Sequence, residues 1–220
     1  MPISNHNISS VIHILRREVK RFSETTLTLV GKKYKSPYLI LISCLLSLRT
    51  KDETTLPASE RLFALADTPE AMLRLSERQI VKIIYPVGFY HVKAKNILAI
   101  SRQILGEFDG RVPNDLDRLL TLPGVGRKTA NLVLTEGFGL PGICVDTHVH
   151  RISNRWGYVR TKSPLETETA LRQKLPRRFW LEINELLVLW GQNICRPISP
   201  HCSICNLRPY CARTGVTASR

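Results

Sequence analysis

Apolar residues recur at helical spacing through most of this 220-residue chain. Close to the N-terminus, five of them share one face of a helix expected over residues 9–22: Ile8, Val11, Ile12, Leu15 and Val19. Residues 38–48 are apolar almost all round, which predicts a buried central helix. No segment shows the strict two-residue alternation of a half-buried strand. The pattern therefore predicts an all-α protein.

Polar residues that favour helix N-termini precede several of the apolar runs. Ser76 is followed three residues later by Gln79, and Ser163 by Glu166, which is the spacing of a capping box. Asp146 stands directly before another helical run and is predicted to be its N-cap. These residues predict where helices begin, independently of the apolar periodicity.

A proline and two glycines interrupt the helical pattern after Leu122, where the chain reads Leu-Pro-Gly-Val-Gly-Arg-Lys-Thr-Ala. Proline cannot continue a helix, and Gly124 and Gly126 permit backbone angles that other residues avoid. We expect a helix to end near Leu122, to turn sharply, and to be followed by a second helix from about Arg127. The free N–H groups at that second N-terminus suit a phosphate and read no base.

Lys128 falls in the first turn of this second helix, and Asp146 follows further along the chain. Taken singly, each has an ordinary interpretation, as a phosphate-contacting lysine and a capping carboxylate. A partly desolvated lysine beside a phosphate site is also a candidate nucleophile. If the two helices face one cleft, the amine and the carboxylate lie on its opposite walls.

The charge balance of the chain is strongly basic. Lys and Arg number 32 against 18 Asp and Glu, which gives a formal net charge of +14 and a pI near 9.9. Such an excess favours a polyanionic partner, most commonly nucleic acid. An anionic membrane is the alternative, but no apolar run reaches the roughly 18–20 residues of a spanning helix. The N-terminus lacks a secretory signal, so we expect an intracellular protein with reduced cysteines.

Four cysteines near the C-terminus follow the spacing C-x6-C-x2-C-x5-C: Cys195, Cys202, Cys205 and Cys211. Four thiolates this close in sequence can surround one metal centre. Zinc more often uses two close pairs, and iron–sulfur clusters accept less regular spacing, so the residues alone leave both open. Two further cysteines lie in apolar surroundings and are predicted to be buried, inert thiols: Cys44 and Cys144.

Together these motifs resemble those of the endonuclease III family of DNA repair glycosylases, over nearly the whole chain. Residues 122–134 are similar to the family's helix–hairpin–helix, and residues 145–151, Val-Asp-Thr-His-Val-His-Arg, to the segment with its catalytic aspartate. The resemblance implies that Lys128 and Asp146 are catalytic. It also implies that the four C-terminal cysteines hold a [4Fe-4S] cluster.

The same resemblance implies several DNA contacts. Arg49 stands where the family usually has a glutamine that helps to fill the gap left by an extruded base, and its planar head can serve there. Phe89 stands where the family places an intercalating wedge, although packing in the core is the alternative. Nearby, Lys93 is expected at most to lie near a phosphate. Further contacts are expected from the hairpin and from the first cysteine loop, which is the segment between Cys195 and Cys202: Gly124, Gly126, Arg127 and Arg196.

The fold implied by the resemblance has two helical lobes with a DNA-binding cleft between them. Residues 30–138 would form the lobe with the helix–hairpin–helix, and residues 1–29 with 139–220 the lobe with the iron–sulfur cluster loop. The implied partner is double-stranded DNA that contains damaged pyrimidines or abasic sites. We expect no membrane partner, and a monomer.

The implied activity is that of a bifunctional DNA glycosylase and AP lyase in base excision repair. The damaged nucleotide is extruded, and the Lys128 amine displaces the base to form a Schiff base. β-Elimination then cuts the strand 3′ to the abasic site, while Asp146 stabilises positive charge on the sugar. The alternatives are a monofunctional mismatch glycosylase, a class that tends to lack the lysine, and a non-catalytic DNA-binding protein. A zinc protein is a third possibility.

Overall fold

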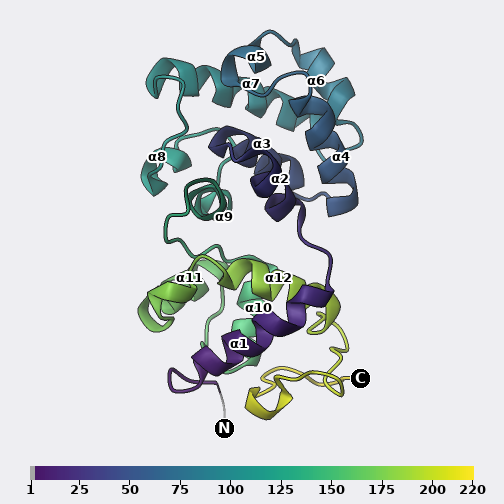
Figure 1. The fold of residues 1–220 in the computed structure, drawn as a ribbon, viewed down its shortest axis with the longest axis vertical. Coiled ribbons are helices and arrows are strands. Elements are labelled where there is room, and N and C mark those ends of the chain that lie inside the picture. The colour runs from purple at the N-terminus through teal and green to yellow at the C-terminus, as the bar shows by residue number, and fades with distance from the viewer. Residues whose placement is uncertain (1–2) are drawn as a thin grey trace. The chain divides into compact units, whose positions relative to one another are not determined.

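The computed structural model describes residues 3–220, and every regular element within them is a helix (Figure 1). The predicted all-α class is therefore confirmed. The chain divides into two compact units. The hairpin unit is Thr25–Leu140, and the cysteine unit runs up to Glu24 and resumes at Pro141.

The hairpin unit is built around α3 (Pro37–Ser47), which contacts the three helices α2, α4 and α7 as well as the segment around α9. Every α3 residue from Tyr38 to Leu46 is buried, so the predicted central helix is confirmed. The other elements are α2 (Thr26–Tyr34), α4 (Asp52–Phe63), α5 (Pro69–Leu73), α6 (Glu77–Ile84), α7 (Tyr90–Glu107), α8 (Leu116–Leu120), α9 (Arg127–Leu132) and the π-helical turn η2 (Val133–Gly137).

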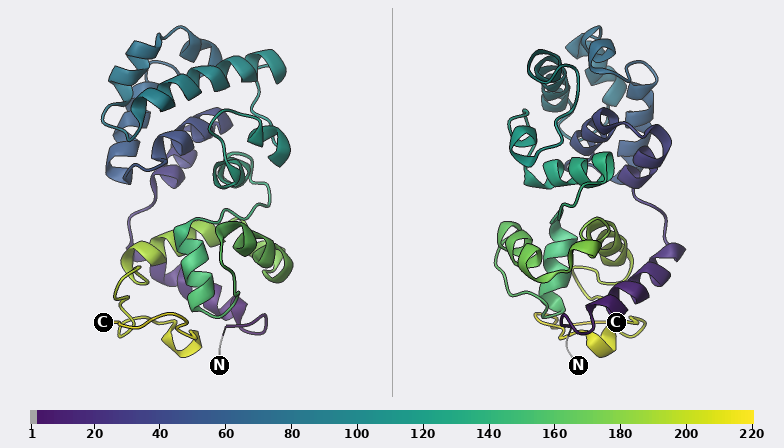
Figure 2. Two further views of the ribbon diagram at one scale, coloured as in Figure 1. Left: turned by 180° about the vertical axis from the view of Figure 1, so that it is seen from behind. Right: turned by 60° about the vertical axis from the view of Figure 1, so that its left-hand side comes forward.

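The cysteine unit packs four helices around one apolar core. Val11 and Leu15 of α1 (Ile8–Glu18) lie in the same core as Trp190 of α12 (Ile183–Asn193). The remaining elements are η1 (Val19–Arg21), α10 (Thr147–Arg155), α11 (Pro164–Lys174), η3 (Arg177–Phe179) and η4 (Arg208–Tyr210). After α12 the chain, yellow in Figure 2, is irregular apart from η4. None of the helices in residues 3–220 has the length and apolar character needed to cross a membrane.

The predicted helix starts are present in both units. Ser76 and Gln79 form both halves of a capping box at the start of α6. The Ser163 hydroxyl accepts the Glu166 amide at the start of α11. Local polar residues therefore begin these helices as expected.

Candidate functional site

The hairpin between α8 and α9 depends on one glycine for its shape. Gly124 has φ +75°, a left-handed backbone that a side chain disfavours. A Cβ at this position would also collide with the side-chain amide of Asn96 on α7. Gly126 is different, because it is the extended N-cap of α9 and nothing lies within 4 Å of the position a Cβ would take. The backbone at the start of α9 is thus left uncovered.

Two cations follow directly at the beginning of α9. The helix starts at Arg127, as the sequence predicts, and both Arg127 and Lys128 are exposed. The next two residues, Thr129 and Ala130, are buried and hold the helix against the rest of the hairpin unit. The exposed end of α9 therefore presents an amine, a guanidinium and open backbone, a combination suited to an anionic ligand.

Asp146 caps α10 in the cysteine unit, which confirms its predicted structural role. Its Oδ1 accepts hydrogen bonds from the amides of His148, at 2.8 Å, and Val149, at 2.9 Å. Both capping bonds use the same oxygen, so Oδ2 takes no part in the cap. The side chain is only half-buried. Asp146 thus carries a carboxylate oxygen that its structural role does not require.

Arg49 and Phe89 meet on the surface of the hairpin unit. Arg49 follows α3 with φ 53°, and Phe89 precedes α7 with φ 57°. The Phe89 side chain is 60% exposed, so the alternative of packing in the core is wrong. The Arg49 guanidinium lies 5.5 Å from the centre of the Phe89 ring, within the range of a cation–π contact. The two side chains form one exposed pair.

Lys93 is a residue whose role the sequence analysis missed. It is only 6% exposed, so the expectation of a surface lysine near a phosphate is wrong. Its Nζ donates to the Leu46 carbonyl at 2.8 Å, to the Leu48 carbonyl at 2.6 Å and to Thr50 Oγ1 at 3.1 Å. Burial lowers its pKa to about 8. One signal was present, because Lys93 shares a helical stripe with the buried Ile97.

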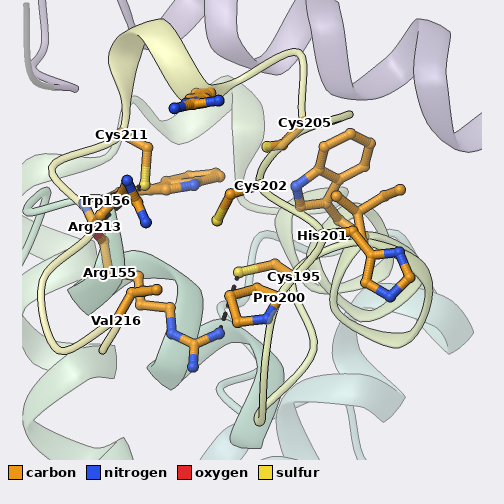
Figure 3. Close-up of a pocket in the computed structure, with 13 residues that line it drawn as sticks. Arg155, Trp156, Cys195, Pro200, His201, Cys202, Cys205, Cys211, Arg213 and Val216 are labelled. Atoms are coloured by element: carbon orange, nitrogen blue, oxygen red, sulfur yellow. Dashed lines mark hydrogen bonds between the residues drawn. The ribbon is translucent and has the colours of Figure 1, made fainter. Parts of the chain in front are cut away.

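The four C-terminal cysteines line one pocket of the cysteine unit. Figure 3 shows their sulfur atoms directed toward a common space, with Trp156 and Arg155 beside it. Burial raises the pKa of Cys205 to about 11. Within residues 3–220, no three His, Cys, Asp or Glu side chains are grouped so that they could hold a metal ion. The four thiols nevertheless share one pocket.

Two arginines of α10 hold the first cysteine loop. Arg155, which is buried, donates to the carbonyl oxygens of Arg196 and Pro197, each at 2.6 Å. Arg151 donates to the Cys195 carbonyl at 2.9 Å. The Arg196 side chain itself is exposed. The helix that Asp146 caps therefore anchors the loop that begins at Cys195.

The two cysteines outside this cluster are buried thiols, as predicted. Burial raises the pKa of the Cys44 thiol to about 12, so this thiol stays neutral.

Comparison with known proteins places these features in one family. The family described as HhH-GPD superfamily base excision DNA repair protein matches residues 42–177. Endonuclease III of Thermotoga maritima is 46% identical over 202 residues, covering 91% of this chain and 92% of that protein. The chloroplastic Endonuclease III homolog 2 of Arabidopsis thaliana is 48% identical over 79% of this chain, which spans 47% of that relative's length.

A solved structure extends the likeness to the fold. The chain resembles the structure of a trapped endonuclease III–DNA covalent intermediate with a TM-score of 0.84 and 31% identity. The match covers 96% of this chain and 97% of the solved one. Sequence and fold therefore agree that this chain belongs to the endonuclease III family of the HhH-GPD superfamily of base excision DNA repair proteins.

Proposed function

We propose that this protein is a bifunctional DNA glycosylase and AP lyase that removes oxidised pyrimidines from duplex DNA. The observation that carries the proposal is the exposed Lys128 at the start of α9, in a chain that is 46% identical to endonuclease III over 91% of its length. The net charge of +14 suits a polyanionic substrate. The hairpin backbone at Gly124 and Gly126, with Arg127, would contact the phosphates.

In the proposed reaction, the damaged nucleotide first leaves the base stack, because its C1′ is shielded within the duplex. The Lys128 amine attacks C1′, the bond from C1′ to the base breaks, and the departing base takes up a proton. The lysine nitrogen loses one proton, the bond from C1′ to the ring oxygen breaks and that oxygen takes up a proton, which leaves a protonated Schiff base. Loss of a C2′ proton then breaks the C3′–O bond and cuts the strand 3′ to the lesion. Water hydrolyses the remaining imine and frees the lysine.

Asp146 is the proposed partner of this chemistry. A carboxylate stabilises the positive charge that develops on the sugar and can carry protons between steps. Because Oδ1 accepts both amides of the cap, we assign this role to Oδ2. The cap also fixes the orientation of the carboxylate, which reduces the reorganisation needed during the reaction.

Arg49 and Phe89 are the proposed contacts to the gap that extrusion leaves. Both are exposed, and the ring and guanidinium are planar groups that can stack on bases. On the cysteine unit, we propose that the exposed Arg196 contacts a phosphate, held in place by the Arg155 bond to its carbonyl.

The residues of the cysteine pocket fit the [4Fe-4S] cluster that is normal in this family, and we propose all four cysteines as its ligands. The four thiols line one pocket, and the chain is 46% identical to endonuclease III of Thermotoga maritima, which together favour the family's cluster over a single zinc ion. Bound there, the cluster would supply a rigid cross-link for a segment that has little regular structure.

Borohydride trapping tests the proposed activity. The protein is incubated with duplex DNA that contains thymine glycol or an abasic site, and the Schiff base is reduced to a stable adduct. We expect an adduct with the native protein and with Lys95→Ala, a change at an exposed lysine of α7, but none with Lys128→Ala. Base release without an adduct would favour the monofunctional alternative. Binding with neither product would favour a non-catalytic DNA-binding protein.

A further inference from the structure

One buried lysine of α7, together with Thr50, links two surface loops of the hairpin unit: residues 48–51 after α3 and residues 85–89 before α7. The Lys93 ammonium donates to the carbonyls of Leu46 and Leu48, at the C-terminal end of α3, and to the hydroxyl of Thr50. A buried ammonium is costly unless its protons are used, and here its three protons have three acceptors. The side chain therefore fixes the path of the chain on both sides of Arg49.

The Thr50 hydroxyl extends this link to the turn before α7. It accepts the Gly88 amide at 3.1 Å and the Lys93 ammonium at 3.1 Å, and it donates to the Leu48 carbonyl at 3.3 Å. The backbones also touch directly, since a Cβ at Gly88 would lie 2.6 Å from the Arg49 carbonyl oxygen. The two loops thus behave as one hydrogen-bonded body.

Each loop presents one exposed residue with an unfavourable backbone. Arg49 and Phe89 both have positive φ, which ordinary side chains avoid and which persists only where the surroundings enforce it. The bonds from Lys93 fix Leu48 and Thr50 on either side of Arg49, and the bond from the Gly88 amide to Thr50 fixes the residue before Phe89; these bonds provide that enforcement. As a result, the Arg49 guanidinium is held over the Phe89 ring before any ligand is present.

We propose that Lys93 is a positioning residue that presents Arg49 and Phe89 to a damaged duplex as one preformed unit. The inference rests on the proposed function, which takes these two residues as contacts to the gap. Side chains that are already ordered lose less conformational freedom on binding, which increases the affinity. Only DNA with a gap can receive the two side chains, so the affinity increases for damaged DNA alone. Lys93 itself, being buried, touches no DNA.

Binding to two duplexes tests this role without any chemistry. One duplex contains a stable tetrahydrofuran abasic analogue and the other is undamaged. Recognition of the gap is measured by a ratio, the Kd for the undamaged duplex divided by the Kd for the abasic duplex. We expect Lys93→Met, which keeps an apolar stem and removes the donors, to lower this ratio by about tenfold, as expected when two side chains must be ordered on binding. The matched change Lys95→Met, at an exposed position of the same helix, should leave it unchanged.

A threonine pair gives a second test that keeps the lysine. Thr50→Val removes the hydroxyl at nearly constant shape and should lower the ratio, whereas Thr50→Ser retains the hydroxyl and should preserve it. The comparison of these two variants tests the positioning role even if Lys93→Met does not fold. An unchanged ratio in both Lys93→Met and Thr50→Val would overturn the proposal.

Repeating Lys93→Met in an Arg49→Ala/Phe89→Ala background distinguishes the positioning of these two residues from a general contribution of Lys93 to the fold. If Lys93 acts through these residues, its loss has no further effect on the ratio there. The same loss in both backgrounds would overturn the inference, as would an Arg49→Ala/Phe89→Ala variant that binds the gap normally. Failure of the proposed function is distinct, because it appears as the absence of a borohydride adduct with the native protein, whatever the binding ratio.

Discussion

The guanidinium of Arg155 donates to the carbonyl oxygen of Arg196 at 2.6 Å and so connects the end of α10 to the first cysteine loop. The N-cap of the same helix is Asp146, the proposed catalytic carboxylate. One helix of about two and a half turns therefore carries the carboxylate at its N-cap and the anchor of the cysteine segment at its other end.

Replacement of Arg155 by Met should destabilise the cysteine unit. The change removes the donor to the carbonyls of Arg196 and Pro197, and hydrogen bonds to a charged group contribute about 1.5–3 kcal/mol each. We expect a loss of about 2–4 kcal/mol in unfolding free energy and a reduced iron content. Thermal denaturation and iron analysis measure these effects. Arg160→Met, at an exposed position after α10, is the control, and an equal effect there would contradict the anchor role.

Changes of Asp146 separate its structural role from its chemical one. Asn caps helices about as well as Asp, so Asp146→Asn should change the unfolding free energy by less than about 0.5 kcal/mol, whereas Asp146→Ala should cost about 1 kcal/mol. Both should slow adduct formation by about 100-fold or more, because neither supplies a negative charge. Single-turnover borohydride trapping and denaturant unfolding give the two readouts.

A control for the Asp146 experiment is Ser163→Ala, which removes the N-cap of α11 in the same unit. It should lower stability by about 1 kcal/mol and leave trapping unchanged. If Asp146→Asn formed the adduct at the native rate, the proposed role of the carboxylate would be wrong.

The two hairpin glycines should respond differently to alanine. Gly124→Ala meets both a positive φ and the Asn96 side chain, and we expect a loss of about 1–3 kcal/mol in unfolding free energy. Gly126→Ala places its methyl group in open space at the N-cap, so its cost should stay below about 1 kcal/mol. Melting temperatures of the two variants compare these costs directly. Equal melting temperatures would contradict the inferred difference.

The lowered pKa of Lys93 predicts that the unfolding free energy depends on pH. Its pKa is lowered from 10.5 to about 8 in the folded protein, so the unfolded chain binds more protons at this residue between these values. The unfolding free energy of the native protein should therefore rise, relative to that of Lys93→Met, as the pH increases through this interval. We expect the unfolding free energy of the native protein to rise by about 1–3 kcal/mol more than that of Lys93→Met between about pH 7 and about pH 10. Denaturant midpoints at a series of pH values measure it, and a parallel pH profile in Lys93→Met would contradict the shift.

Metal analysis distinguishes the two centres that the cysteines could hold. We expect the purified protein to contain about four irons and about four acid-labile sulfides per chain. Cys202→Ser should lower both, whereas Cys44→Ser, at a buried thiol far from the pocket in sequence, should change neither. One zinc per chain without sulfide would contradict the cluster assignment.

Much of the local structure could be predicted because its causes are local. The apolar segment after Pro37 is a buried helix, α9 begins at Arg127 after the glycine hairpin, and Asp146 caps α10. In each case the deciding residues lie within a few positions of one another. The chemistry-bearing residues were also visible, since Lys128, Asp146 and the cysteines stand in short motifs.

The sequence by itself therefore determined the helical class, several helix starts and the family, all of which depend on spacing along the chain. The end of the first helix was not determined, because α1 stops at Glu18 and a short turn, η1, follows. Only the tertiary structure decided that Lys93 is buried beneath Thr50, that Arg49 lies over Phe89, and that α10 holds the cysteine loop. Each of these contacts joins residues about 40 positions apart. Periodicity shows which face of a helix is covered but not which partner covers it, because the partner is selected by packing and hydrogen bonding between distant segments.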